Sequence, residues 1–170
     1  MKKTAKRILS VFALGILLTS SEYVLASGSL RRSEAQEIKA ESAAPEFTLQ
    51  TIAGKSVALK DFKGKNVILF FFTTWCPYCR DKIPYLVKEY KHYQEQNIEL
   101  LLIDVGESKT KVDAFCVKNN LPFDILLDSA TKTADDYGVV GVPTFALVTK
   151  DGRVARVDNE LPSNYAKYFE

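Results

Sequence analysis

Two cysteines separated by two residues, Cys76 and Cys79, are the side chains of this sequence best placed for covalent chemistry. They lie between a continuously apolar run at 67–73, expected to be a buried strand, and a stretch with helical spacing at 79–96. At the start of a helix, amide N–H groups and the helix dipole favour the thiolate form of Cys76. Because cysteines at this spacing can form a disulfide locally, we expect Cys76 to attack a substrate disulfide and Cys79 to resolve the mixed disulfide. The same steps in reverse oxidise a substrate dithiol.

Two other roles for the cysteine pair stay open. One is a structural disulfide, although so short a loop removes little chain entropy. The other is a zinc site, but it needs two further ligands, and Cys116 and His92 stand alone in amphipathic segments. We therefore expect no metal, a buried and unreactive Cys116, and a solvated His92.

A second motif, Gly141-Val142-Pro143-Thr144, directly precedes an apolar run at 145–148. If the Val142–Pro143 peptide bond is cis, the chain turns sharply and leaves the Val142 backbone beside Cys76, able to pair with an extended substrate. An ordinary trans turn before a strand is the alternative. Trp75 and Tyr78 flank the expected nucleophile, and shielding of the core is the alternative role for Trp75. The residues predicted to bind substrate are Trp75, Pro77, Tyr78, Val142 and Pro143.

Short β-type runs alternate with helical ones from residue 45 onward, which is the order of an α/β fold whose sheet is covered by helices. The predicted strands are 47–51, 56–59, 67–73, 98–105, 123–127, 145–148 and 154–157, and the predicted helices are 79–96, 109–119, 132–137 and 164–169. The first two and the last two strands are expected to form hairpins around turns at Gly54 and Gly152. The cysteine pair then lies at a strand-to-helix junction of the sheet.

The beginning of the chain has the pattern of a secretory signal. Four basic residues, at positions 2, 3, 6 and 7, precede an uncharged apolar run at 8–19 that is short for a membrane span. Small residues before Ser27 predict cleavage after Ala26, with an uncleaved membrane anchor as the alternative. We therefore expect a signal peptide at 1–26, a flexible polar spacer at 27–44, and one domain at 45–170 that acts outside the cytoplasm.

The charge balance argues against a nucleic-acid partner. The whole chain carries a net charge of +2, but loss of residues 1–26 removes 4 of its 23 basic and 1 of its 21 acidic residues, which leaves 19 against 20. No basic stripe survives that subtraction. Contact with a membrane is expected only through the N-terminal segment.

Several motifs together resemble a known family. They are APEFTL at 44–49, DFKGK at 61–65, FTTWCPYCR at 72–80, Pro84, LLD at 126–128, YGVVGVPT at 137–144 and Asp151-Gly152. In order and spacing, over about residues 44–156, they resemble the TlpA/ResA-like extracytoplasmic branch of the thioredoxin superfamily, within the AhpC/TSA-Redoxin-like superfamily.

The resemblance implies a thioredoxin fold. Such a fold has a central mixed β-sheet of four to five strands flanked by helices, here with an N-terminal β-hairpin extension and a cis Pro143. It also implies a thiol:disulfide oxidoreductase that reduces disulfides of envelope proteins, for instance in cytochrome c maturation. The expected partners are protein disulfide substrates and a membrane thiol carrier that donates electrons, and no cofactor is expected.

Two departures from the family concern the proton on Cys79. The branch usually has a Glu three residues after the second cysteine, where this chain has Lys82, and thioredoxin has a buried Asp where this chain has Phe70. Asp81 is turned about 100° away around the helix from the position of Lys82. We therefore expect deprotonation of Cys79 to depend on water, on Asp81 or on a substrate group.

Four hypotheses follow from these residues. The first is a disulfide reductase of the cell envelope, and the second is a dithiol oxidase or isomerase that uses the same site. The third is a peroxidase, since the stretch 45–65 is shared with peroxiredoxins, although Leu69 stands where those have a Pro. The fourth is a binding module with an inert disulfide.

Overall fold

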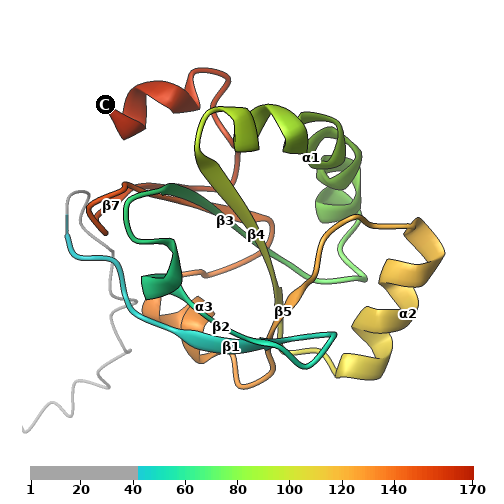
Figure 1. Cartoon of the computed structure of the whole chain (residues 1–170). Coiled ribbons are helices and arrows are strands. Elements are labelled where there is room, and N and C mark those ends of the chain that lie inside the picture. Colours follow the sequence, from blue (N-terminus) through green and yellow to red (C-terminus); the bar gives the residue numbers. More distant parts are fainter. Residues whose placement is uncertain (1–41) are drawn as a thin grey trace, which may run out of the picture. The chain divides into compact units, whose positions relative to one another are not determined.

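A mixed seven-stranded sheet forms the centre of residues 42–170, the part of the chain that the computed structural model describes (Figure 1). The strands are β1 (Thr48–Thr51), β2 (Ser56–Ala58), β3 (Asn66–Phe72), β4 (Ile98–Val105), β5 (Leu126–Asp128), β6 (Thr144–Val148) and β7 (Val154–Asp158). Their order across the sheet is β2-β1-β5-β4-β3-β6-β7. The β3–β4 and β4–β5 pairs are parallel and the other neighbours are antiparallel.

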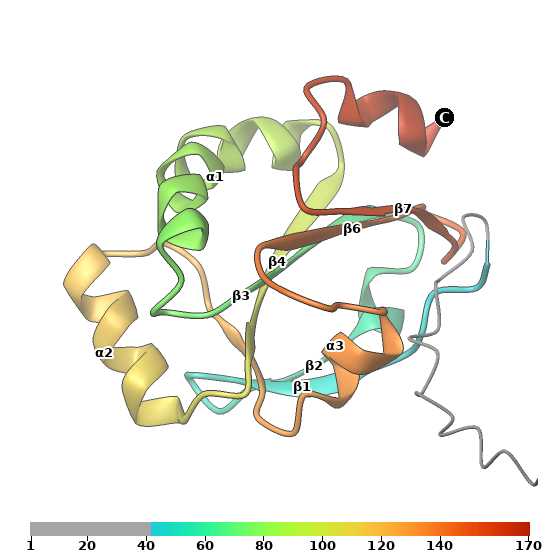
Figure 2. The same ribbon diagram turned by 180° about the vertical axis from the view of Figure 1, so that it is seen from behind.

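Helices cover both faces of this sheet. Figures 1 and 2 show α1 (Pro77–Glu95) and α2 (Lys109–Asn119) on one side and the short α3 (Lys132–Asp136) on the other. Two 3₁₀ helices complete the fold, η1 (Leu59–Phe62) and η2 (Tyr165–Phe169). Two hydrophobic cores result, one on each face of the sheet.

Strand β3 is buried on both faces because it lies between β4 and β6 near the middle of the sheet. Alternate side chains enter the two cores: Phe70 and Phe72 join the core that contains α1, while Leu69 and Phe71 join the other. The Phe70 ring stacks on Phe145 and Phe72, with centroids 4.7 Å and 5.7 Å away. This packing holds the end of β3, from which the chain enters the cysteine pair.

The predicted α/β thioredoxin fold with a β-hairpin extension is confirmed, with differences in detail. The sheet has seven strands instead of four to five because β1 of the hairpin pairs with β5 through Gln50 and Thr51 and so extends the sheet. The second predicted strand ends at Ala58, whose N–H donates to the Asp61 carboxylate, and Leu59 begins η1. The predicted helix at the C-terminus is a 3₁₀ helix.

The described residues begin inside the range predicted as a spacer. Ala44 N–H donates to the Gly152 carbonyl, Val154 N–H donates to the Ser42 carbonyl, and Ala43 forms a β-bridge with Arg153. The predicted signal peptide and the rest of the spacer lie outside the described residues. Within 42–170, no helix has the length and apolar character needed to cross a membrane.

Candidate active site

The two cysteines lie where β3 gives way to α1. Cys76 is the N-cap residue of α1, and Pro77 takes the first helical position, where its missing N–H costs no hydrogen bond. The backbone N–H of Cys79 points at the sulfur of Cys76 and donates to it at 3.3 Å. The Cys76 sulfur therefore lies at the N-terminus of α1, with a backbone N–H of the helix directed at it. Both cysteines are free thiols in this structure.

The second cysteine lies behind the first. Cys79 is completely buried. This burial, together with the hydrogen bond to Cys76 and the charge of that residue, raises the pKa of the Cys79 thiol to about 12, against a smaller opposing effect of the Thr73 backbone. Cys79 therefore keeps its proton at neutral pH. A buried thiol that keeps its proton is suited to the resolving role and not to the first attack on a substrate disulfide.

The loop before β6 lies against the nucleophile. The Val142–Pro143 peptide bond is cis, as predicted. The Cys76 thiol donates to the Val142 carbonyl oxygen at 3.6 Å. Asn159, just after β7, donates to the Pro143 carbonyl at 2.8 Å and so fixes the loop from its other side. The structure therefore brings together the two motifs that the sequence singled out, 66 residues apart.

Apolar side chains are exposed around this contact. Trp75 is 63% exposed and Tyr78 is 71% exposed, and Pro77 between the cysteines is also exposed. Val140, two residues before Val142, is 86% exposed, although sequence reasoning did not select it. Large exposed apolar side chains beside a reactive group are typical of a surface that binds a partner. That these residues and Val142 bind substrate remains a prediction.

Three polar residues near the site were missed by sequence reasoning: Asp104, Glu107 and Asn159. Glu107 accepts hydrogen bonds from the backbone and side chain of Thr74, two residues before Cys76. One signal in the sequence was available: Asp104 is a charged residue inside an apolar strand, where an Asp is seldom buried without a partner.

Phe70 and Lys82 stand at the two positions where an acidic residue was expected, and both have other contacts. Phe70 is completely buried among aromatic rings. Lys82 forms an ion pair with Glu160 of the segment after β7, so its ammonium group is directed toward a carboxylate of its own. Asp81 is exposed on α1. Neither the Phe70 nor the Lys82 position therefore supplies a side chain that accepts a proton.

Cys116 and His92 have the environments expected from the sequence. Cys116 is buried in the core beneath α2, and burial, with smaller contributions from nearby carboxylates, raises the pKa of its thiol to about 11. His92 is exposed on α1. Within 42–170, no group of three or more His, Cys, Asp or Glu side chains is placed to hold a metal ion.

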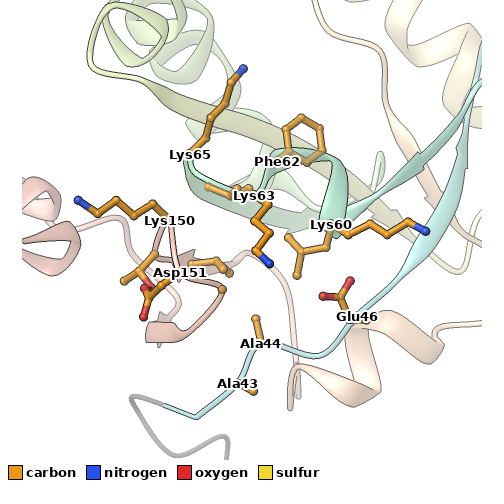
Figure 3. A pocket seen from close by; sticks show the side chains of 14 residues that line it. Ala43, Ala44, Glu46, Lys60, Phe62, Lys63, Lys65, Lys150 and Asp151 are labelled. Carbon is orange, nitrogen blue, oxygen red and sulfur yellow. Dashed lines mark hydrogen bonds between the residues drawn. The ribbon is translucent and has the colours of Figure 1, made fainter.

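A pocket of about 330 Å³ lies at the opposite end of the strands from Cys76 (Figure 3). Its walls include Val67 at the start of β3, Val148 at the end of β6 and the turn that follows. Figure 3 shows the side chains of Lys60, Lys65 and Lys150 extending in different directions. The ammonium groups of these three lysines do not converge on one point.

Comparison with known proteins agrees with the geometry. The model of the AhpC/TSA family matches residues 40–157 of the chain. The chain is 34% identical over 157 residues to the thiol-disulfide oxidoreductase ResA of Bacillus subtilis, a match that covers 92% of this chain and 87% of the relative. It is 36% identical over 154 residues to ResA of Bacillus thuringiensis subsp. konkukian, covering 91% and 87% of the two chains.

A solved structure of a thiol:disulfide interchange protein is also similar to this chain. A putative thiol:disulfide interchange protein DsbE from Chlorobium tepidum superposes with a TM-score of 0.67 at 26% sequence identity. The match covers 71% of this chain and 85% of that one.

Proposed function

This chain belongs to the AhpC/TSA family and is a thiol-disulfide oxidoreductase similar to ResA, and from that premise we propose that it reduces disulfide bonds of proteins outside the cytoplasm. One observation carries the proposal. The Cys76 sulfur contacts the Cys79 N–H and the cis-proline loop, and the Cys79 thiol next to it is buried. The extracytoplasmic location is supported by the signal pattern of the sequence.

The reaction runs in two exchanges. The Cys76 thiolate attacks one sulfur of the substrate disulfide, which forms a mixed disulfide and releases the other sulfur as a thiolate that takes up a proton. Cys79 then loses its proton and attacks the Cys76 sulfur, which forms the Cys76–Cys79 disulfide and releases the second substrate thiol. Two electrons and two protons have then passed to the substrate.

The cis-proline loop and the apolar residues around Cys76 hold the substrate during the first exchange. We propose that an extended segment of the substrate pairs with the Val142 backbone, since this carbonyl lies 3.6 Å from the Cys76 sulfur. Trp75, Pro77, Tyr78 and Pro143 then contact the residues next to the substrate disulfide. These side chains favour a protein substrate over a small disulfide because only a protein covers them.

A membrane thiol carrier is the electron donor that we propose for regenerating the dithiol. The resemblance to the ResA-like branch and the N-terminal signal or anchor pattern support this assignment, as they support a role in cytochrome c maturation.

Substrate contact by the exposed aromatic residues can be tested with two substitutions, Trp75→Ser and Tyr78→Ser. We expect each to lower kcat/KM for insulin reduction about tenfold, because each removes apolar surface that binding to a protein buries. Reduction of hydroxyethyl disulfide should stay unchanged, because so small a substrate does not cover these side chains. The measurement is insulin precipitation in one assay and thiol release in the other.

A matched control is Val117→Ser, which alters an apolar side chain that is 76% exposed on α2. It should leave both activities at the wild-type level. Equal losses on insulin and on the small disulfide would contradict substrate contact by Trp75 and Tyr78. No insulin reduction by the wild-type protein would contradict the proposed function itself.

A further inference from the structure

Two carboxyl groups lie beneath the loop that leads into the cysteine pair. Asp104 is the second-last residue of β4 and is paired in register with Phe72 of β3. Glu107 follows two residues after the end of β4. Because β3 and β4 are parallel, their carboxyl ends meet at the same edge of the sheet, and the loops after them are neighbours. Asp104 is fully buried and Glu107 is nearly so.

Glu107 binds the loop directly. Its carboxylate accepts hydrogen bonds from the Thr74 backbone N–H and, at 3.0 Å, from the Thr74 hydroxyl. Lys111, on the first turn of α2, forms an ion pair with the same carboxylate. Thr74 is two residues before Cys76, and the backbone of its neighbour Thr73 forms a hydrogen bond with Cys79. The loop held by Glu107 therefore leads directly into Cys76 and contacts Cys79.

Asp104 lies behind Glu107 and binds it. One oxygen of Asp104 accepts the Glu107 backbone N–H at 3.2 Å. The other oxygen is buried, and no donor within 42–170 reaches it. The Glu107 carboxylate interacts with Asp104, and a protonated Asp104 donates a hydrogen bond to it. A buried polar atom without a partner is costly, so a proton between the two carboxyl groups satisfies both.

The surroundings keep that proton on Asp104. Burial, then the hydrogen bond and negative charge of Glu107, raise the pKa of Asp104 to about 8. Burial also acts to raise the pKa of Glu107, but hydrogen bonds from Lys111 and Thr74 outweigh it and lower that pKa below the ordinary value. Two other titratable groups interact with Asp104. The charge of Lys111 acts to lower the pKa of Asp104 but is outweighed, and the second group is the buried thiol of Cys116 on α2. Glu107 is thus the charged member of the pair.

We propose that Asp104 and Glu107 are positioning residues for the dithiol: they hold the Thr74 backbone and so keep Cys76 against the Val142 carbonyl with Cys79 behind it. This inference rests on the proposed function, since it concerns the same two thiols. When Asp104 loses its proton at alkaline pH, two carboxylates face each other in a buried site, and their repulsion weakens the hold on Thr74. The pH dependence of Cys76 reactivity then contains an alkaline step that belongs to neither cysteine.

The test uses Asp104→Asn and Glu107→Gln in the full chain. Asparagine keeps the shape of Asp104 and donates to Glu107 at every pH. We therefore expect the rate of Cys76 alkylation by iodoacetamide between pH 5 and 10 to lose its alkaline step in Asp104→Asn. Glutamine removes the charge that Thr74 and Lys111 bind, so Glu107→Gln should lower kcat/KM for insulin reduction about tenfold.

Glu99→Gln is the matched control. Glu99 also belongs to β4, but it lies at the opposite end of that strand from Asp104 and forms an ion pair with Lys65. It should retain the wild-type alkylation profile and rate. Wild-type profiles in both Asp104→Asn and Glu107→Gln would overturn the positioning role and leave the proposed function intact. Failure of the wild-type protein to reduce insulin would contradict the proposed reductase function. The alkylation profiles would still decide whether Asp104 and Glu107 position the dithiol.

Thermal unfolding gives a second measurement that needs no activity. The pKa of Asp104 is raised in the folded protein. Between about pH 4 and pH 8, the folded protein therefore keeps a proton on Asp104, whereas the unfolded chain has lost it. Wild-type stability therefore falls as pH rises through that window, and Asp104→Asn escapes the loss. We expect the Tm of Asp104→Asn minus that of wild type to increase from pH 5 to pH 8. A constant difference would show that Asp104 does not hold the proton and would overturn the proposed alkaline step.

Discussion

Replacement of Cys76 by serine is expected to lower kcat/KM for insulin reduction by more than about a thousandfold. A serine hydroxyl cannot form a mixed disulfide, and it stays protonated even at the N-terminus of α1, where the Cys79 N–H reaches the Cys76 sulfur. Cys79 cannot take over the attack, because it is completely buried and its pKa is raised to about 12. Insulin precipitation under a fixed supply of reductant measures the loss.

Cys116→Ala is the control for this experiment. Cys116 lies in the core beneath α2, away from the surface at which a substrate arrives. Its replacement by another small apolar side chain should leave kcat/KM within about a factor of two of wild type. Substantial activity in Cys76→Ser, or loss of activity in Cys116→Ala, would show that the nucleophile has been assigned wrongly.

The variant Cys79→Ser is expected to stop the reaction at its midpoint. Cys76 can still attack a substrate disulfide, but the thiol that releases the substrate is missing. We expect a covalent complex between the variant and a disulfide-containing protein, formed in up to one equivalent, and a turnover rate reduced more than about a hundredfold. Non-reducing electrophoresis and intact-protein mass spectrometry measure the complex.

The wild-type protein and a double variant are the controls for this covalent complex. Wild-type protein should show almost no complex, because buried Cys79 lies next to Cys76 and resolves it. The double variant Cys76→Ser/Cys79→Ser should show none, although Cys116 remains. A complex in the double variant, or none in Cys79→Ser, would mean that the order of the two cysteines is wrong.

The strand and helix around the cysteines could be predicted because their patterns are local. The run at 67–73 is apolar at every position, and such a run is expected where a strand is buried on both faces. The structure places β3 between β4 and β6, which is the environment that such a run needs. The Cys–x–x–Cys spacing similarly predicts that both sulfurs lie at one helix terminus, and both do.

The contacts that hold the site could not be predicted, because they join loops that are distant in the sequence. Glu107 and Thr74 are 33 residues apart, and their contact depends on the parallel register of β3 and β4. No local pattern encodes that register. Asn159 reaches the cis-proline loop from the end of β7 for the same reason, across 16 residues.

The group that takes the proton of Cys79 could not be identified from the sequence. Phe70 and Lys82 occupy the two positions where an acid was expected, so the sequence left only water, Asp81 or a substrate group to take the proton of Cys79. The structure adds a buried acid pair, Asp104 and Glu107, under the loop that contacts Cys79. That pair was hidden because the loops after β3 and β4 become neighbours only in the folded sheet.

The direction of electron flow is the central claim, and the reduction potential of the Cys76/Cys79 couple tests it most directly. The full chain is equilibrated with defined ratios of reduced and oxidised dithiothreitol, and the fraction of free thiol is measured after acid quenching and alkylation. A chain that reduces protein disulfides should give a potential below about −250 mV. A potential near about −120 mV, the value of a strong dithiol oxidant, would contradict the assignment as a reductase.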